Sequence, residues 1–224
     1  MNISIFIHAA ILPGCKERIL QYLNIIKSNN LILYADIIIC FVGDGELPIT
    51  PDEINSYSTK ILLVRVSNNL TDYELPTLQY IYNYCNNNLN NYILYIHTKH
   101  IGQKHINICI EDQIEYMLYF LISTWEKCVS KLQNFNTCGV DLRNEPTLHY
   151  SGNFWWANSN YICQLPSPTE FNCLYKYPNP LNSLRHNQEF WICFIKTGHN
   201  SLWDCNINVY ERHLHRYENI NYII

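Results

Sequence analysis

Residues 36–46 read DIIICFVGDGE, an apolar run rich in β-branched side chains that ends in a Gly-Asp-Gly turn. A short apolar run without polar alternation is typical of a strand that is covered on both faces of a parallel sheet. Similar runs occupy residues 3–8 (ISIFIH), 60–66 (KILLVRV) and 92–96 (YILYI). The four stretches therefore predict four buried strands of one sheet.

Stretches with helical spacing separate these strands. Apolar side chains recur every three or four positions from Ile19 to Ile26, from Leu78 to Cys85, and over residues 111–132. In the second half of the chain, prolines divide the sequence into short segments, and a shorter helix is expected there near residues 187–196. Strands that alternate with helices predict an α/β fold with a mostly parallel central sheet flanked by helices.

The composition limits the classes of function. The chain has 224 residues, of which 48% are hydrophobic, so it can build a substantial core and is not disordered. We predict one domain over residues 1–224, in which a regular half (1–132) precedes an irregular half (133–224). The net charge of −4 argues against a general electrostatic grip on nucleic acid, so no nucleic-acid partner is expected.

Neither a membrane span nor an export signal is predicted. No apolar run reaches the length of about 18 residues that a spanning helix needs, and the N-terminus lacks a basic region before its apolar run. The ten cysteines form no CxxC pair. We therefore expect reduced thiols, no structural zinc and a cytoplasmic location.

Polar clusters follow three of the predicted strands. They are Gly43 to Glu46, then Asn68, Asn69, Asp72 and Glu74, and finally His97 to His100. Ligands of open parallel sheets bind at the carboxyl ends of the strands. Three clusters at successive strand ends therefore predict a binding site at that edge.

The tripeptide His97-Thr98-Lys99 gives the most specific indication of the ligand. Residues two apart on an extended segment point the same way, and a cationic pair aimed into a pocket suits phosphate. The alternative is a structural one, in which Lys99 is a solvated loop lysine and His97 a half-buried histidine with its hydrogen bonds satisfied.

Two later segments also contain candidates. Residues 149–157 read HYSGNFWWA, where the aromatic rings suit stacking on sugars and the Ser and Asn suit hydrogen bonds to hydroxyls. In the alternative, a Trp belongs to the core and Gly152 to a turn. Glu189 precedes an apolar run and suits a general base, although an acidic residue in a first helical turn is also favoured on electrostatic grounds.

Together these segments resemble the GT-A-fold glycosyltransferases, which use nucleotide-sugar donors. The resemblance covers residues 3–196 and is carried by FVGDGE at 41–46, VSNNLTDYELPTL at 66–78, ILYIHTKH at 93–100, HYSGNFWWA at 149–157 and QEFWI at 188–192. It is closest to a branch with an HTKG-type motif, which includes bacterial surface-polysaccharide enzymes and giant-virus homologues. The resemblance implies a Rossmann-like fold with a nucleotide-sugar-binding half (1–132) and an acceptor or catalytic half (133–224).

The same resemblance implies a transferase that moves a sugar from a UDP- or GDP-type donor to a hydroxyl of a glycan or glycoprotein, in the host cytoplasm if the protein is viral. The residues expected at the site fall into three groups. Lys99, His97 and Glu189 would be catalytic, with Glu189 as general base; His8, Asp44, Glu74, Thr77, Thr98 and Lys99 would bind the donor; and Tyr150, Ser151, Gly152, Asn153, Trp155, Trp156 and Arg185 would bind the sugar or acceptor.

The chain departs from the wider fold class at the metal-binding motif. His97 and Lys99 occupy the places of the usual DxD pair, and His100 replaces the Gly of the branch. An ammonium offers no lone pair to a metal, so we expect Lys99, helped by His97, to supply the positive charge. No cofactor is expected, while Asp44 or Asp141 leaves binding of Mn²⁺ or Mg²⁺ open.

Two further hypotheses follow from this departure. One is a nucleotide-sugar- or carbohydrate-binding protein that has lost turnover, and the other is metal-dependent transfer with ligands drawn from the nine histidines and the acidic turn at 44–46. Near the C-terminus, Arg212, His213, His215 and Arg216 form a small cationic cluster. It forms either a solvated helix face or a cover over the site, and no oligomeric state follows from the sequence.

Overall fold

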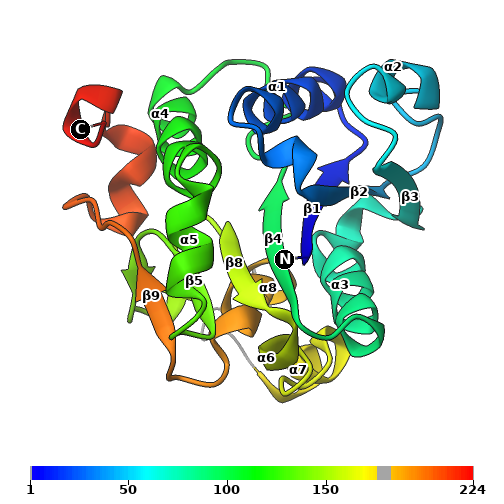
Figure 1. Ribbon diagram of the computed structural model, residues 1–224. Helices are drawn as coiled ribbons and strands as arrows, with labels where there is room; N and C mark the ends of the chain where they lie inside the picture. Colours follow the sequence, from blue (N-terminus) through cyan, green and yellow to red (C-terminus); the bar gives the residue numbers. More distant parts are fainter. Residues whose placement is uncertain (1, 176–182, 224) are drawn as a thin grey trace.

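The computed structural model describes residues 2–175 and 183–223. Within them a seven-stranded sheet has the order β3-β2-β1-β4-β8-β5-β9 (Figure 1). The strands are β1 (Asn2–Ala10), β2 (Ala35–Val42), β3 (Ile61–Ser67), β4 (Asn91–His97), β5 (Thr137–Gly139), β8 (Trp155–Asn158) and β9 (His199–Ser201), and a separate pair joins β6 (Leu142–Arg143) to β7 (His149–Tyr150). Strands β3, β2, β1 and β4 run parallel, β8 is antiparallel to both β4 and β5, and β9 is parallel to β5.

Helices cover both faces of this sheet. The α-helices are α1 (Cys15–Ser28), α2 (Pro51–Asn55), α3 (Leu75–Asn87), α4 (Ile108–Leu118), α5 (Trp125–Lys131), α6 (Ser159–Ile162), α7 (Pro168–Leu174) and α8 (Ser183–Phe190). Shorter turns are η1 (Leu31–Leu33), η2 (Leu70–Asp72), η3 (Tyr119–Ser123), η5 (Trp191–Cys193), η6 (Val209–Leu214) and η7 (Asn219–Asn221). The C-terminal segment with η6 and η7 lies beside α4 (Figure 1).

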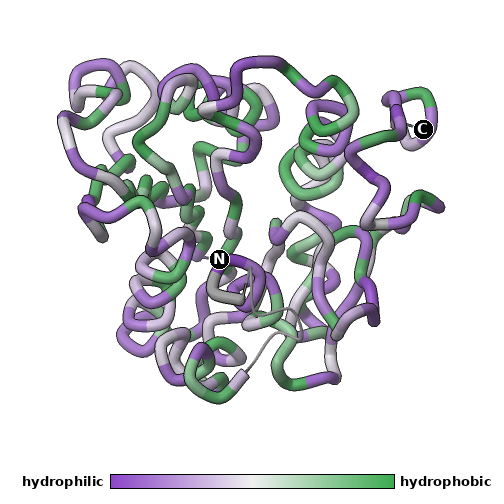
Figure 2. Tube along the Cα trace, turned by 180° about the vertical axis from the view of Figure 1, so that it is seen from behind, coloured by the Kyte–Doolittle hydropathy of each residue, from purple (hydrophilic) through white to green (hydrophobic). Residues whose placement is uncertain are grey.

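The alternation of side chains along the strands divides the core into two layers. Ile5 and Ile7 of β1 face the layer formed with α1, α4 and α5, whereas Phe6 faces the layer formed with α3, α6 and α8. Successive side chains of a strand point to opposite faces, so an unbroken apolar run fills both layers. Figure 2, seen from behind, shows hydrophobic and hydrophilic stretches alternating along the helices, as expected where one helix face meets a core.

The predicted fold class is confirmed. The four apolar runs are β1, β2, β3 and β4, and the predicted helices between them are α1 and α3. The prediction of one long helix over 111–132 is wrong, because η3 is a π-helical turn between α4 and α5. At its end the Thr124 hydroxyl donates to the Phe120 carbonyl at 2.9 Å, and the Thr124 backbone N–H donates to Tyr119 instead of continuing the α-helical pattern.

The second half differs more from the prediction. The helix expected near 187–196 begins earlier and ends at Phe190, where η5 tightens the chain. Strands β5, β8 and β9 were not predicted; each is three or four residues long, too short to show a period. They extend the same sheet that β1 to β4 begin.

Two expectations concern the whole chain. All ten cysteines are free thiols, and seven of them are buried. Within residues 2–175 and 183–223, no helix is both long enough and apolar enough to cross a membrane.

Candidate active site

A cavity of about 500 Å³ lies at the carboxyl ends of β1, β2 and β4, and we call it the first cavity. Strand ends, the loop before α3 and the helix α8 all contribute to its wall. The polar and charged lining residues are His8, Thr71, Tyr73, Glu74, His97, Thr98, Lys99, His100, Gln103, Arg185 and Glu189. Parallel strands end together here, so their loops meet around one space.

A second cavity of about 350 Å³ adjoins the first, and the two share Lys99, Ile110 and Glu189. The remaining lining residues come from α4, the β6–β7 segment, α8 and η6. They are Gln113, Glu145, Pro146, His149, Ser151, Gly152, His186, Phe190, Tyr210, Arg212 and His213. Lys99 and Glu189 therefore face both cavities at the point where they meet.

Hydrogen bonds at the end of β4 fix the position of the His97-Thr98-Lys99 segment. The Thr98 backbone N–H donates to the His8 carbonyl at 2.9 Å, and the Tyr22 hydroxyl donates to the His97 carbonyl at 3.0 Å. Lys99 is the first residue beyond these bonds, so its side chain is free to enter the cavities. In the described part of the chain, neither a hydrogen bond nor an ion pair engages its ammonium group.

The charge of Lys99 is held in an unfavourable environment. Burial lowers the pKa of its ammonium below the ordinary value, and the nearby carboxylates of Glu189 and Glu74 oppose that effect. Removal from water disfavours the charged form, whereas an anion close by favours it. A bound anion would relieve the same cost, which makes Lys99 a suitable anion-binding group.

The surroundings of the His97 ring do not favour the expected sharing of positive charge with Lys99. Burial, followed by the charge of Lys99, lowers the pKa of His97 to about 3, and burial lowers the pKa of His8 to about 4. Both rings are therefore neutral near pH 7. His97 Nε2 is 3.0 Å from the Gly152 carbonyl oxygen, and His8 Nδ1 is 2.8 Å from the Thr77 hydroxyl. The His97 ring thus ties the end of β4 to the segment at Gly152, and the His8 ring ties β1 to α3.

Glu74 stands at the centre of a buried network behind the first cavity. Its Oε2 accepts hydrogen bonds from the Tyr95 hydroxyl at 2.5 Å and from Asn153 Nδ2 at 2.7 Å. Its backbone N–H donates to Gln188 Oε1 at 2.7 Å, which ties the start of α3 to α8. The Glu74 carboxylate is thus fixed in the wall by Tyr95 and Asn153, and the Glu74 backbone is fixed by Gln188.

Helix α8 carries the two other charged groups of the first cavity, Arg185 and Glu189. Within the described residues neither side chain forms a hydrogen bond or ion pair. Gln188, which precedes Glu189 in α8, fixes this helix because its side-chain amide also donates to the Asp72 carbonyl at 3.3 Å. The site therefore presents Lys99, Arg185 and Glu189 as charged groups whose side chains form no hydrogen bond or ion pair within residues 2–175 and 183–223.

Comparison with known proteins identifies the family. The model of a domain of unknown function, DUF8361, matches residues 14–193. The chain belongs to this family. The match includes Lys99, Glu189 and most of the residues that line both cavities of this DUF8361 protein.

Other comparisons add little to this DUF8361 assignment. Among solved structures, the crystal structure of a "putative nucleotide-diphospho-sugar transferase" from Desulfovibrio desulfuricans G20 is similar, with a TM-score of 0.48 and 9% identity over 90% of this chain and 80% of that chain. A similarity this low does not indicate a function. No curated protein matches the sequence significantly.

The prediction that Trp155 and Trp156 frame a sugar pocket is wrong for this DUF8361 chain. Both side chains are fully buried, and neither lines the first or the second cavity. They lie within β8, so they point to opposite faces of the sheet. Trp155 packs on Tyr95 in one core layer, and Trp156 Nε1 donates to the Leu121 carbonyl at 2.8 Å in the other.

Four further expected contacts lie outside both cavities. Tyr150 and Thr77 are fully buried, and their hydroxyls pair with Thr137 and His8. Asn153 is 1% exposed and supports Glu74, while Asp44 is exposed at the turn after β2 and faces neither cavity. The remaining expected residues line the cavities. Those of the second cavity are Ser151 and Gly152, and those of the first are His8, Glu74, His97, Thr98, Lys99, Arg185 and Glu189.

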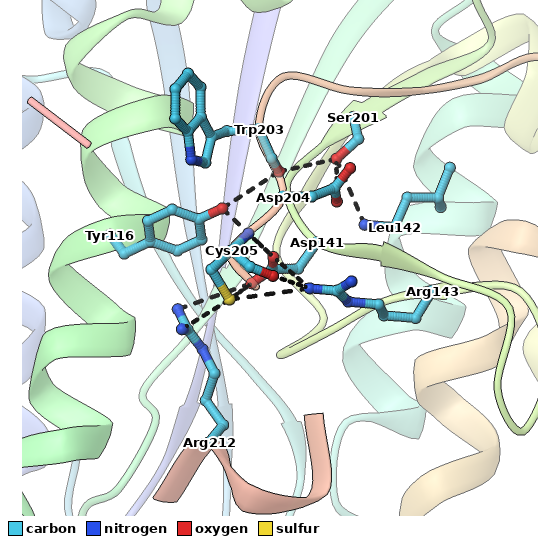
Figure 3. Close-up of polar contacts among 9 residues, drawn as sticks. All are labelled: Tyr116, Asp141, Leu142, Arg143, Ser201, Trp203, Asp204, Cys205 and Arg212. Atoms are coloured by element: carbon cyan, nitrogen blue, oxygen red, sulfur yellow. Dashed lines mark hydrogen bonds and ion pairs between the residues drawn. The ribbon is translucent and has the colours of Figure 1, made fainter. Parts of the chain in front are cut away.

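The two carboxylates for which metal binding was left open, Asp44 and Asp141, do not form a ligand set within the described residues. No group of three or more His, Cys, Asp or Glu side chains comes together as ligands within residues 2–175 and 183–223. The Asp141 carboxylate is buried and already engaged: Arg143 and the Cys205 backbone N–H donate to it at 3.0 and 2.7 Å, and Arg212 lies 3.7 Å away (Figure 3). Within the described residues, neither Asp141 nor Asp44 therefore belongs to a set of side chains that could hold a metal ion.

The C-terminal cationic cluster separates into different roles. Arg212 is 4% exposed, and its guanidinium contacts the rings of Tyr116 and Tyr217 at 4.9 and 5.0 Å from their centroids. Figure 3 shows Arg212 and Arg143 converging on Asp141 and Cys205 from opposite sides. His213 lines the second cavity with Arg212, whereas His215 and Arg216 are exposed. This segment therefore covers part of the site, which was one of the two interpretations.

The sequence analysis missed Gln113 and His149 as candidate site residues. Gln113 lies among the apolar residues of α4, and no local pattern marks a buried amide on such a helix. His149 stands at the start of the HYSGNFWWA segment, but only the fold brings it near Gln113. The sequence shows only a Gly at position 152, and the structure gives the reason for it: its φ is 93°, and an added Cβ would lie 2.7 Å from Met117 Sδ of α4.

Proposed function

We propose that this protein is a glycosyltransferase that moves a sugar from a nucleotide diphosphate sugar to a hydroxyl acceptor. The observation that carries the proposal is the position of Lys99 and Glu189 at the junction of two adjoining cavities. A transferase needs a donor and an acceptor on either side of one reacting centre. The cation and the carboxylate at that centre form no hydrogen bond or ion pair with the described residues, and their charges match those that such a transfer creates.

In the proposed reaction the acceptor hydroxyl attacks the anomeric carbon of the donor. The new bond joins the acceptor oxygen to this carbon, while the bond from the carbon to the diphosphate oxygen breaks and its electron pair leaves with the nucleoside diphosphate. Glu189 takes the proton of the hydroxyl. The Lys99 ammonium stabilises the negative charge that develops on the leaving phosphate.

The first cavity suits the donor for a second reason. Its volume falls within the range of about 300–1,000 Å³ that is usual for small-molecule sites. Arg185 adds a second cation, and Tyr73 lines the same wall near the ends of β2 and β3 with an aromatic face that suits a nucleobase. Neutral His8 and His97 fix the surrounding backbone and leave Lys99 and Arg185 to meet the diphosphate.

The test combines binding and transfer. Thermal shifts are measured with UDP and GDP, with and without Mn²⁺, because a ligand of the native state raises the apparent melting temperature. Release of nucleoside diphosphate is then measured with a panel of UDP- and GDP-sugars. Lys99→Met and Glu189→Gln are compared with matched surface changes at exposed positions, Lys127→Met and Glu115→Gln.

We expect Lys99→Met to weaken nucleotide binding and Glu189→Gln to abolish transfer while binding is retained. Near-normal transfer by both folded variants would overturn the roles proposed for the two residues. Binding of a nucleotide sugar without turnover across the whole donor panel would instead favour a binding protein that has lost activity. Absence of any nucleotide binding would exclude both functions.

A further inference from the structure

Three polar side chains of the second cavity are buried yet lack hydrogen-bond partners on the side of the cavity. Gln113, His149 and Ser151 are 6%, 4% and 4% exposed, and all three line this cavity. Within the described residues no hydrogen bond engages the Gln113 amide or the Ser151 hydroxyl. Buried polar groups are normally paired, so three such groups around one space point to a ligand that completes them.

The geometry of His149 defines what it offers to that ligand. Its Nδ1 lies 2.8 Å from the Thr147 carbonyl oxygen, which can only accept a hydrogen bond. Nδ1 therefore carries a proton, and in the uncharged ring Nε2 is an acceptor. A ligand hydroxyl can donate a hydrogen bond to His149 Nε2. Other ligand hydroxyls can donate to the Gln113 amide oxygen and accept from its NH₂ group.

The charges around the second cavity favour a neutral ligand. Lys99 and Arg212 are cations that line this cavity, and the Arg212 guanidinium faces the Asp141 carboxylate at 3.7 Å. Glu145 and Glu189 also line the cavity, and two carboxylates would repel an anion. The rings of Phe190 and Tyr210 supply apolar faces of the kind that pack against sugar rings.

We propose that the second cavity binds the acceptor as a neutral sugar residue, with its hydroxyls hydrogen-bonded to Gln113, His149 and Ser151. The identification of this sugar as the acceptor rests on the proposed function. The sugar site itself rests on the Gln113 amide, the Ser151 hydroxyl and His149 Nε2, none of which has a hydrogen-bond partner within the described residues. The shared wall at Glu189 places a hydroxyl of this sugar next to the proposed base.

The probes are free glucose, galactose, mannose and N-acetylglucosamine, with glucuronate and inorganic phosphate as anionic counterparts. Binding is measured by saturation-transfer NMR on the full chain. The variants are Gln113→Met, His149→Asn, which keeps an N–H toward Thr147 but removes the Nε2 acceptor, and Ser151→Ala. Gln164→Met makes the first of these changes on the exposed surface. Melting curves identify any variant that fails to fold, and the other two then carry the test.

At least one neutral sugar should bind the wild type, and each folded variant should weaken it by roughly 2- to 12-fold, the effect of one lost hydrogen bond. Gln164→Met should bind like the wild type. Failure of all four neutral sugars to bind, equal binding by the variants, or preferred binding of glucuronate or phosphate would overturn the proposal.

Thermal shifts with UDP and GDP on the same samples separate this inference from the proposed function. Sugar binding without any nucleotide binding would leave the sugar site standing and refute the transferase. Nucleotide binding that depends on Lys99, without sugar binding, would do the reverse.

Discussion

Residues 97–99 end and follow β4, and residues 155–156 lie in the neighbouring strand β8, yet the side chains of the two segments differ in where they point. His97-Thr98-Lys99 continues past the last ladder pair of β4 into the cavities, whereas Trp155 and Trp156 lie inside β8 between β4 and β5. Residue type alone made both segments look like binding sites. Position relative to the end of a strand separates the one at the cavity from the one in the core.

The largest expected effect tests the structural side of this comparison. Trp156→Ala should lower the free energy of unfolding by about 3–5 kcal/mol, because it removes a fully buried indole and leaves a cavity. Nucleotide binding, measured well below the melting temperature, should be unchanged since Trp156 lines neither cavity.

Chemical denaturation of Trp156→Ala beside Trp203→Ala provides the measurement, because the Trp203 side chain is 36% exposed and should cost less. If Trp156→Ala does not fold, Trp156→Phe replaces it with a smaller loss of volume. Equal losses at the two tryptophans, or loss of UDP binding by a folded Trp156 variant, would contradict the assignment of β8 to the core.

The next largest effect tests the functional side. Lys99→Met should weaken binding of UDP or GDP by about 10- to 100-fold, the contribution of a charge-assisted hydrogen bond. It should not lower the free energy of unfolding at pH 7, because burial already disfavours the charge and lowers the pKa of Lys99. Calorimetric titration and urea denaturation measure the two quantities, and a large loss of stability with intact binding would reverse the comparison.

His8 and His97, two of the three histidines that line the first cavity, have buried rings, and the response of stability to pH tests this. An unfolded His8 binds a proton with an ordinary pKa of 6.5, while burial lowers the pKa in the folded protein to about 4. The unfolded state therefore binds more protons between these values, so stability is present above pH 6.5 and is lost as the pH falls toward 4.

From pH 7 to pH 5 His8 should account for about 2 kcal/mol of lost stability. His8→Asn removes the titrating ring. Between pH 7 and pH 5 the free energy of unfolding of this variant should therefore fall by about 2 kcal/mol less than that of the wild type, as measured by urea denaturation at both pH values. An identical pH dependence of the variant and the wild type would show that His8 is accessible to protons in the folded state.

The sequence predicted the first half of the fold well because long apolar runs and helical spacing are local signals. Residues 36–42 needed nothing beyond their own pattern to be assigned to a buried strand. The second half depends on tertiary contacts, since three- and four-residue strands such as β5 and β8 show no period. Their pairing partners, and not their sequence, make them strands.

The site was predictable to the extent that it follows strand ends. Lys99 and Glu74 come directly after strands or in the next loop, so the sheet rule placed both at one edge. Gln113 comes from the middle of α4, and Arg212 comes from η6 near the C-terminus. Only the packing of these elements against the β6–β7 segment reveals that they share a cavity.

The smallest predicted effect concerns His100, at the position where the branch that the sequence resembles has Gly. Its φ of 59° is in the left-handed region, which explains why Gly suits the position. His100 offsets the strain by accepting a hydrogen bond from the Asn107 backbone N–H at 3.0 Å. His100→Gly removes both the strain of about 1–2 kcal/mol and a bond worth about 1 kcal/mol, so stability should change by no more than about 1 kcal/mol.

His100→Val provides the contrast, because it loses the same bond and keeps a β-branched side chain in the left-handed region. It should be less stable than His100→Gly by at least about 1 kcal/mol in urea denaturation. If the two variants were equally stable, the backbone at residue 100 would not be held in this conformation. The loop that carries Lys99 into the cavities would then lack its fixed turn, and Lys99 would resemble a solvated loop lysine.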